Sequence, residues 1–139
     1  MKGVSQVTVT ALDKRYKLLE RDLTDRTRKI LLLLKQRGAA LEIYLVGGAT
    51  MRKLNRQYRG KDEATNVLAF ESPRNFPEIR ARSLGEIYLC PSHIKRRGED
   101  IQLMLAHGIL HLSGFNHETE SDRMTMEKME EKLLTWLNP

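Results

Sequence analysis

Four short segments rich in β-branched and aliphatic residues predict β-strands. The first, 4–10, alternates apolar and polar positions with a period of two, as expected for a strand with one buried face. The others are apolar runs closed by turn residues, and the loop 71–83 carries Pro73 and Pro77. The four predicted strands are 4–10, 41–46, 65–70 and 84–90.

Between and after these strands the apolar positions follow helical spacing. The predicted helices are 13–37, 50–59, a short one at 93–97, 99–113 and 119–137. We expect the pair Thr24-Asp25 to break and recap the first helix, and Gly38 to end it. Gly60, Gly98 and Gly114 end the next three.

The last helix carries its own start signal and its own apolar face. Thr119 with Asp122 fits a capping box. Spacing places four apolar side chains on one face, which predicts that this face lies in the core: Met126, Met129, Leu133 and Trp136.

Together these elements predict one α+β domain over 1–139. We expect a four-stranded mixed sheet and about five helices, with the helix 99–113 in the core. The length of 139 residues fits one domain, and the sequence shows no domain boundary.

Composition excludes several classes of protein. The single cysteine, Cys90, ends an apolar strand, so a buried free thiol is expected, and no intrachain disulfide or cysteine-based metal cage is possible. The longest aliphatic run, 30–34, is too short to cross a bilayer, and the N-terminal residues have no apolar signal region. These features predict a cytoplasmic protein without a membrane partner.

The charge is unevenly distributed. The net charge is +6, but residues 1–117 carry 21 basic and 12 acidic side chains, a net charge of +9. Residues 118–139 carry 3 basic and 6 acidic side chains, a net charge of −3. A basic body favours a polyanionic partner, and nucleic acid is the first candidate, although a solvated charged surface has the same composition.

Three of the four histidines lie close together in the sequence. His107 and His111 are four residues apart, so on a helix both imidazoles point to the same side. Gly114 then frees the backbone to turn, which lets His117 return to the same point. Three imidazoles with one open position are typical of a catalytic zinc site, so we predict one Zn²⁺ per chain.

The metzincin peptidases space three histidines similarly, but they place a glutamate directly after the first. Here that position is Gly108, so the catalytic base of a peptidase is missing. His93 lies among basic residues outside the motif and is expected at the surface, not as a fourth ligand.

The segment 51–61 has five basic residues and no acid. Met51, Leu54 and Tyr58 form one predicted core stripe of its helix. A second stripe of arginines suits phosphate, because guanidinium is forked and permanently charged. Its members are Arg52, Arg56 and Arg59, and Lys61 follows. Arg59 precedes Gly60 at the helix end, where it can turn into a cleft.

These segments resemble the YbeY family of zinc-dependent bacterial endoribonucleases. The matching residues are Leu54-Asn55, Tyr58-Arg59-Gly60, the strand 65–70, Leu84-Gly85-Glu86-Ile87 and the histidine motif 107–117, in the family's order. The resemblance implies that His107, His111 and His117 bind zinc and that Arg59 is the functional arginine. It also implies cleavage of single-stranded RNA, maturation of the 3′ end of 16S rRNA and ribosome quality control, with the ribosome or its small subunit as partner.

Departures from the family pattern concern the rate and the choice of substrate. Asn116 stands where the family has an aspartate that could orient a ligand histidine. Ala69 and Glu71 replace a serine and a proline. Two other hypotheses stay open at this point: a metallohydrolase of a non-RNA substrate, and a non-catalytic ribosome-binding factor with a structural metal. In the leading hypothesis Arg59 is catalytic, and Arg52, Arg56 and Lys61 bind RNA.

Overall fold

The computed structural model describes residues 5–72 and 82–139. Its elements run in the following order: β1 (Gln6–Ala11), a 3₁₀ turn η1 (Lys14–Leu19), α1 (Glu20–Leu33), β2 (Ala39–Leu45), α2 (Gly48–Arg59), β3 (Val67–Glu71), β4 (Arg82–Leu89), α3 (Pro91–Arg96), α4 (Ile101–Leu112) and α5 (Glu120–Leu137). The predicted loop 71–83 lies largely outside the described residues, except at its ends, where Glu71 and Arg82 belong to strands.

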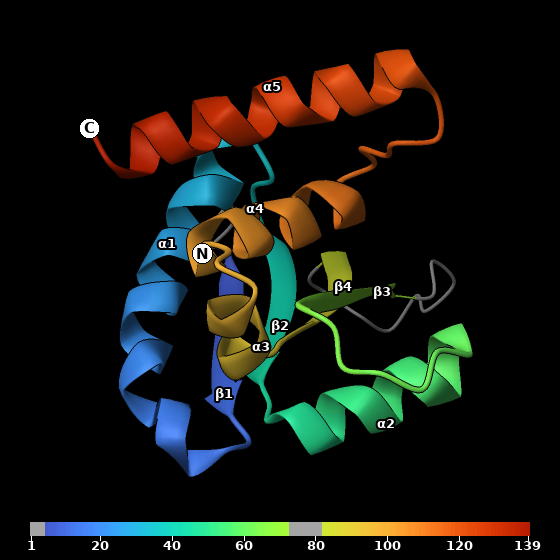
Figure 1. Cartoon of the computed structure of the whole chain (residues 1–139). Coiled ribbons are helices and arrows are strands. Elements are labelled where there is room, and N and C mark those ends of the chain that lie inside the picture. Colours follow the sequence, from blue (N-terminus) through green and yellow to red (C-terminus); the bar gives the residue numbers. More distant parts are fainter. Residues whose placement is uncertain (1–4, 73–81) are drawn as a thin grey trace.

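The four strands form one mixed sheet with the order β1-β2-β4-β3 (Figure 1). β1 and β4 both pair with β2 in parallel, and β3 pairs with β4 in the antiparallel sense. The predicted α+β fold with a four-stranded mixed sheet is confirmed. β3 is an edge strand, so one side of its backbone faces away from the sheet.

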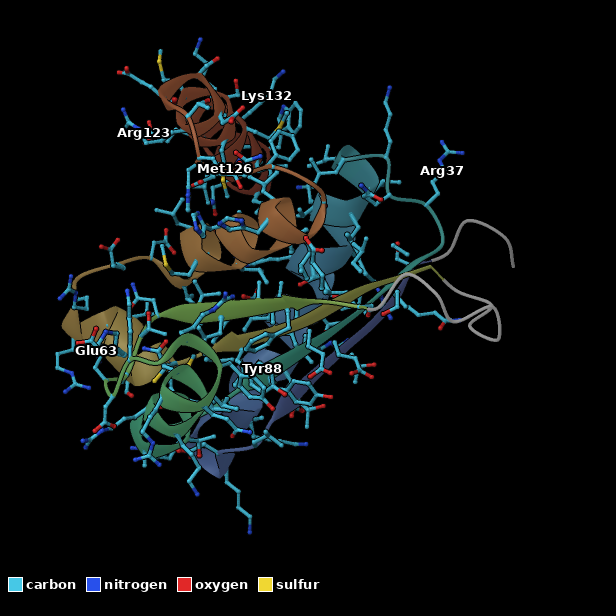
Figure 2. The ribbon with its side chains drawn as sticks, turned by 90° about the vertical axis from the view of Figure 1, so that its right-hand side faces the viewer. Arg37, Glu63, Tyr88, Arg123, Met126 and Lys132 are labelled. Atoms are coloured by element: carbon cyan, nitrogen blue, oxygen red, sulfur yellow. The ribbon has the colours of Figure 1, made fainter. Side chains whose placement is uncertain are left out.

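The two faces of the sheet carry different layers (Figure 2). Leu41, Ile43 and Leu45 of β2 alternate into the main core, which they share with α1, α4 and α5. A smaller cluster around Met51 forms where α2 packs on the opposite face. None of the helices among the described residues is both long and apolar enough to cross a membrane.

The predicted helix 13–37 is wrong at both ends. Asp13 caps the separate 3₁₀ turn, and α1 begins only at Glu20, whose carboxylate accepts the N–H of Ala11 at 2.8 Å. The pair Thr24-Asp25 does not break α1, because the Thr24 hydroxyl donates to the carbonyl of Glu20 inside the helix. The helix ends at Leu33 and not at Gly38, which lies in the turn before β2.

The last helix has the predicted cap but a rotated core face. The Thr119 side chain accepts the N–H of Asp122 at 3.0 Å. Leu137 is buried, whereas Trp136 is 38% exposed under Lys132. At 100° per residue, position 137 lies within about 20° of Met126 around the helix, whereas position 136 lies about 80° away. Leu137 therefore takes the core position predicted for Trp136.

Candidate active site

Two of the three histidines are placed by α4. Asp100 caps this helix by accepting the N–H of Gln102 at 2.8 Å. His107 and His111 lie one turn apart, with ring centroids separated by 4.8 Å. Gly108 between them faces the sheet, and a Cβ atom there would approach Ile87 to 3.1 Å and Val67 to 3.4 Å. The glycine thus lets α4 lie close to the sheet, which sets the two imidazoles beside β3.

The turn after α4 brings the third histidine, His117, back towards the other two. Gly114 has a φ of 103°, a backbone conformation that residues with a side chain rarely adopt. The N–H of Phe115 donates to the carbonyl of Leu110 at 3.0 Å, which directs the chain back along the helix. As a result Nε2 of His117 lies 3.3 Å from Nε2 of His111. The predicted convergence of the three histidines is present in the structure.

This donor set fits a metal ion. One nitrogen from each of the three imidazoles can be chosen so that all lie within 4.8 Å of one another. Two nitrogens bound tetrahedrally at about 2.0–2.1 Å are separated by about 3.3–3.4 Å, which matches the His111–His117 distance. Within the described residues this is the group of three such side chains that could hold a metal ion, and it does not include His93.

A carboxylate from α5, that of Glu130, contacts one of these histidines. This contact was not predicted from the sequence. Oε1 of Glu130 lies 3.1 Å from Nδ1 of His107, and its side chain is only 13% exposed. Glu130 is four residues after Met126 and three before Leu133, both of which are buried. A carboxylate on this apolar face was the available signal.

Asn116 has a different role from the one considered for it. Its Oδ1 accepts the N–H of Glu118 at 3.1 Å and so shapes the loop that carries His117. Among the described residues, the carboxylate in contact with one of the three clustered histidines is that of Glu130.

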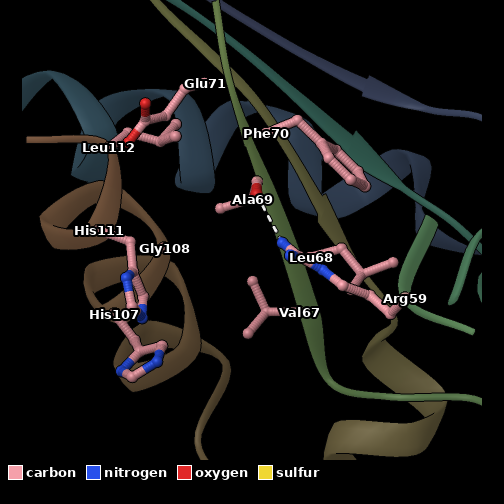
Figure 3. A pocket seen from close by; sticks show the side chains of 10 residues that line it. All are labelled: Arg59, Val67, Leu68, Ala69, Phe70, Glu71, His107, Gly108, His111 and Leu112. Atoms are coloured by element: carbon pink, nitrogen blue, oxygen red, sulfur yellow. Dashed lines mark hydrogen bonds between the residues drawn. The ribbon is translucent and has the colours of Figure 1, made fainter. Parts of the chain in front are cut away.

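The site lies in a cleft of about 570 Å³ between α4 and β3. His107 and His111 line it from α4, and Arg59 lines it from the end of α2 (Figure 3). Gly60, with a φ of 72°, ends α2 as predicted. Nη2 of Arg59 donates to the carbonyl of Ala69 at 3.3 Å, and its guanidinium carbon lies 5.6 Å from the centre of the Phe70 ring.

The other basic candidates lie outside this cleft. Nε and Nη2 of Arg52 donate to the two carboxylate oxygens of Asp62 at 2.8 and 3.0 Å. Nη1 of Arg56 lies 3.8 Å from the same carboxylate. The hydrogen bonds from Arg52 lower the pKa of Asp62, so this carboxylate stays charged. Lys61 is exposed beside them.

The stripes predicted for α2 are partly correct. Met51 is fully buried and Leu54 packs against the same cluster, but Tyr58 is 57% exposed. Asn55 is buried instead, and its side-chain amide donates to the carbonyl of Glu63 at 2.8 Å. This hydrogen bond ties the helix to the loop that leads into β3.

Burial affects the ionisation of the site. It lowers the pKa of His111, and the neighbouring imidazoles of His107 and His117 lower it further. His111 therefore favours the neutral form, which is the form that binds metal. Cys90 is buried, as predicted.

Comparison with known proteins gives consistent matches. The model of the family described as Endoribonuclease YbeY matches residues 6–138. The Endoribonuclease YbeY of Nitrosomonas eutropha is 38% identical over 108 residues, covering 72% of this chain and 73% of the relative. That of Persephonella marina is 32% identical over 135 residues, covering 84% and 88%.

A solved structure matches as well. The solution structure of a protein from Thermotoga maritima is 26% identical and superimposes with a TM-score of 0.57. The match covers 95% of this chain and 91% of the other.

Proposed function

This chain belongs to the YbeY family of endoribonucleases, and we propose that it cuts single-stranded RNA with one zinc ion held by His107, His111 and His117. The observation that carries the proposal is the convergence of three imidazoles, two of which, His107 and His111, line one cleft together with Arg59. Three imidazole ligands are typical of catalytic zinc sites, and the cleft beside His107 and His111 gives a substrate access to them. A bound zinc ion supplies Lewis acidity, which polarises a phosphoryl oxygen and makes a water molecule more acidic.

Glu130 sets the tautomer and the orientation of His107 for metal binding. Its carboxylate accepts the Nδ1 proton of His107, which leaves Nε2 of that ring without a proton and free to bind. The same hydrogen bond fixes the plane of the ring. Because Glu130 lies on α5, the helix that covers α4 contributes directly to the centre (Figure 1).

Arg59 is the proposed catalytic residue on the opposite wall. Among the described residues it has no carboxylate partner, and its one hydrogen bond is to a carbonyl oxygen. A guanidinium has five N–H donors, so most remain available for the phosphate oxygens on which negative charge develops. The Phe70 ring and the Ala69 carbonyl hold the group in place.

Arg52, Arg56 and Lys61 are proposed to bind the flanking RNA backbone. Two of them already contact Asp62, so a phosphate must compete with that carboxylate. Their contribution is therefore expected to be smaller than that of Arg59 and dependent on salt.

We further infer that the natural substrate is ribosomal RNA. The basic body, with a net charge of +9 over residues 1–117, suits a large polyanion. Together with the family membership, this supports a role in maturing the 3′ end of 16S rRNA and in ribosome quality control, with the small subunit as partner and the cytoplasm as location. Restoration of mature 16S 3′ ends in a bacterium that lacks its own YbeY tests this role.

The direct test uses purified protein and a labelled single-stranded RNA. We expect cleavage that is lost on chelation and restored by zinc, while the same sequence in a duplex stays intact. A metallohydrolase of another substrate, or a ribosome-binding factor with a structural metal, would leave the RNA uncut under every condition. Such a result would overturn the proposal.

A further inference from the structure

The ring of Tyr58 is exposed beside the cleft. Tyr58 precedes Arg59 at the end of α2, and it is 57% exposed. It rests with its edge towards Phe70, at a centroid distance of 5.2 Å and an interplanar angle of 61°. The open face of this ring is available to a flat partner, because covering an aromatic surface is favourable.

Phe70 connects this ring to the cleft. Phe70 itself lines the cleft, and the Arg59 guanidinium lies 5.6 Å from the centre of its ring (Figure 3). Phe70 also contacts the ring of Tyr88 on the neighbouring strand β4, at a centroid distance of 5.8 Å, in the cluster that α2 covers. Tyr58, Phe70 and Arg59 form one surface, which we call the aromatic ledge.

The other exposed aromatic side chain in the described part of the chain makes a useful contrast. Trp136 lies on α5, 38% exposed, with the ammonium group of Lys132 5.5 Å from its ring centre. It does not line the cleft. Among the described residues, Tyr58 is the one with an open ring beside Arg59, the arginine proposed to bind phosphate.

We propose that Tyr58 stacks against a nucleobase of the RNA strand whose phosphate Arg59 holds. This inference rests on the proposed function and adds a base-binding subsite to it. Single-stranded RNA presents unstacked bases, and proteins bind them on aromatic rings next to groups that hold the backbone. Every base has a π-face, so the ledge selects single strands over duplexes without requiring a particular sequence.

Binding measurements with a 2′-O-methylated single-stranded RNA, shown by gel electrophoresis to stay uncut during the measurement, test the subsite apart from cleavage. Tyr58→Ala is expected to weaken binding about 5- to 150-fold, the range of one base stacked on an aromatic ring. Tyr58→Phe should bind nearly as the unmodified protein does. Tyr58→Leu, which keeps an apolar contact with Phe70 but offers no ring, should behave like Tyr58→Ala. Trp136→Ala is the matched control and should leave affinity unchanged.

Fluorescence reports the contact directly. The chain has one tryptophan, Trp136. In the double variant Tyr58→Trp, Trp136→Phe the only tryptophan sits on the aromatic ledge, where RNA should quench its emission strongly. In the unmodified protein the emission of Trp136 should hardly change with the same RNA.

The outcomes separate this inference from the proposed function. If the unmodified protein cuts RNA, but Tyr58→Ala and Tyr58→Leu bind as tightly as it does, the subsite is wrong and the nuclease stands. Equal quenching at positions 58 and 136 would also refute it. If the unmodified protein neither binds nor cuts RNA, both proposals fail. Thermal melting of each variant establishes that it is folded, and Tyr58→Phe provides the conservative comparison.

Discussion

His107 is the residue at which the site and the core meet. One side of its imidazole faces the cleft, and the other contacts the largely buried Glu130 at 3.1 Å. The histidine side and the Arg59 side of the cleft therefore differ in how they are held. The histidine wall is fixed by a carboxylate from another helix, whereas Arg59 is fixed by a backbone carbonyl and an aromatic ring. These contacts lead to separate predictions for the metal and for catalysis.

Removal of the Glu130 carboxylate should weaken metal binding. Glu130→Ala leaves the His107 ring unoriented, and loss of such a contact typically lowers metal affinity about 10- to 100-fold. Glu130→Gln keeps an acceptor oxygen and should lose less. Competition with a chromophoric zinc chelator measures the affinities. Glu131→Ala, at an exposed neighbouring position, should match the unmodified protein, and an equal loss there would show that the effect is not specific to Glu130.

Arg59 should matter for the rate and not for the metal. Arg59→Ala is expected to lower the single-turnover cleavage rate about 10²- to 10³-fold, because it removes donors from the developing phosphoryl charge. Zinc content should not change. Arg56→Ala should mainly weaken RNA binding and flatten its salt dependence. Small and equal effects of both variants on rate would mean that Arg59 is only part of a charged surface.

At the scale of elements, β3 is placed by its pairing with β4, and Gly85 makes this pairing possible. Gly85 has a φ of 137° and pairs with Glu71, beside an irregularity in the β2–β4 register. A Cβ atom at Gly85 would overlap the carbonyl oxygen of Phe70. Since β3 forms one wall of the cleft, the geometry of the site depends on this glycine.

Gly85→Ala should therefore destabilise the protein strongly. The added methyl group meets backbone that cannot move aside, so we expect a loss of more than about 2 kcal/mol in the free energy of unfolding. Gly38→Ala is the matched control, because Gly38 also has a positive φ but no atom within 4 Å of the added Cβ. It should cost about 1–2 kcal/mol, for the backbone conformation alone. Urea unfolding measures both, and equal losses would exclude the clash with Phe70.

At the scale of the whole molecule, the proposed metal centre joins the last two helices of the chain. Its proposed ligands lie on α4 and on the loop after it, and Glu130 lies on α5. Because α4 and α5 both belong to the main core, a bound ion is linked to the global stability. Metal binding to the native state alone stabilises that state.

Zinc should consequently raise the melting temperature. At a free concentration of about one hundred times Kd the stabilisation is about 2.7 kcal/mol, or roughly 5–10 °C for a chain of this size. Differential scanning fluorimetry with buffered zinc measures the shift. His117→Ala should lose most of it, because only two imidazoles remain. A shift of the same size in that variant would place the ion elsewhere.

Much of the architecture followed from short-range pattern. Strands, helices and the convergence of His107, His111 and His117 depend on spacings of a few residues, which the sequence displays directly. The predictions were wrong where contacts with residues distant in sequence decide where a helix begins or which of its faces is buried. α1 begins at Glu20, whose carboxylate meets Ala11 of a neighbouring strand, and Trp136 yields its core position to Leu137.

The sequence alone therefore determined the donor set, the fold class and the position of Arg59 at the end of a helix. Only the tertiary structure decided which groups these side chains meet. It pairs Arg52 with Asp62 and leaves Arg59 facing the cleft, and it brings Glu130 to His107 across 23 positions of sequence. Such contacts depend on how helices pack on the sheet, and periodicity along one helix carries no information about the helix that will cover it.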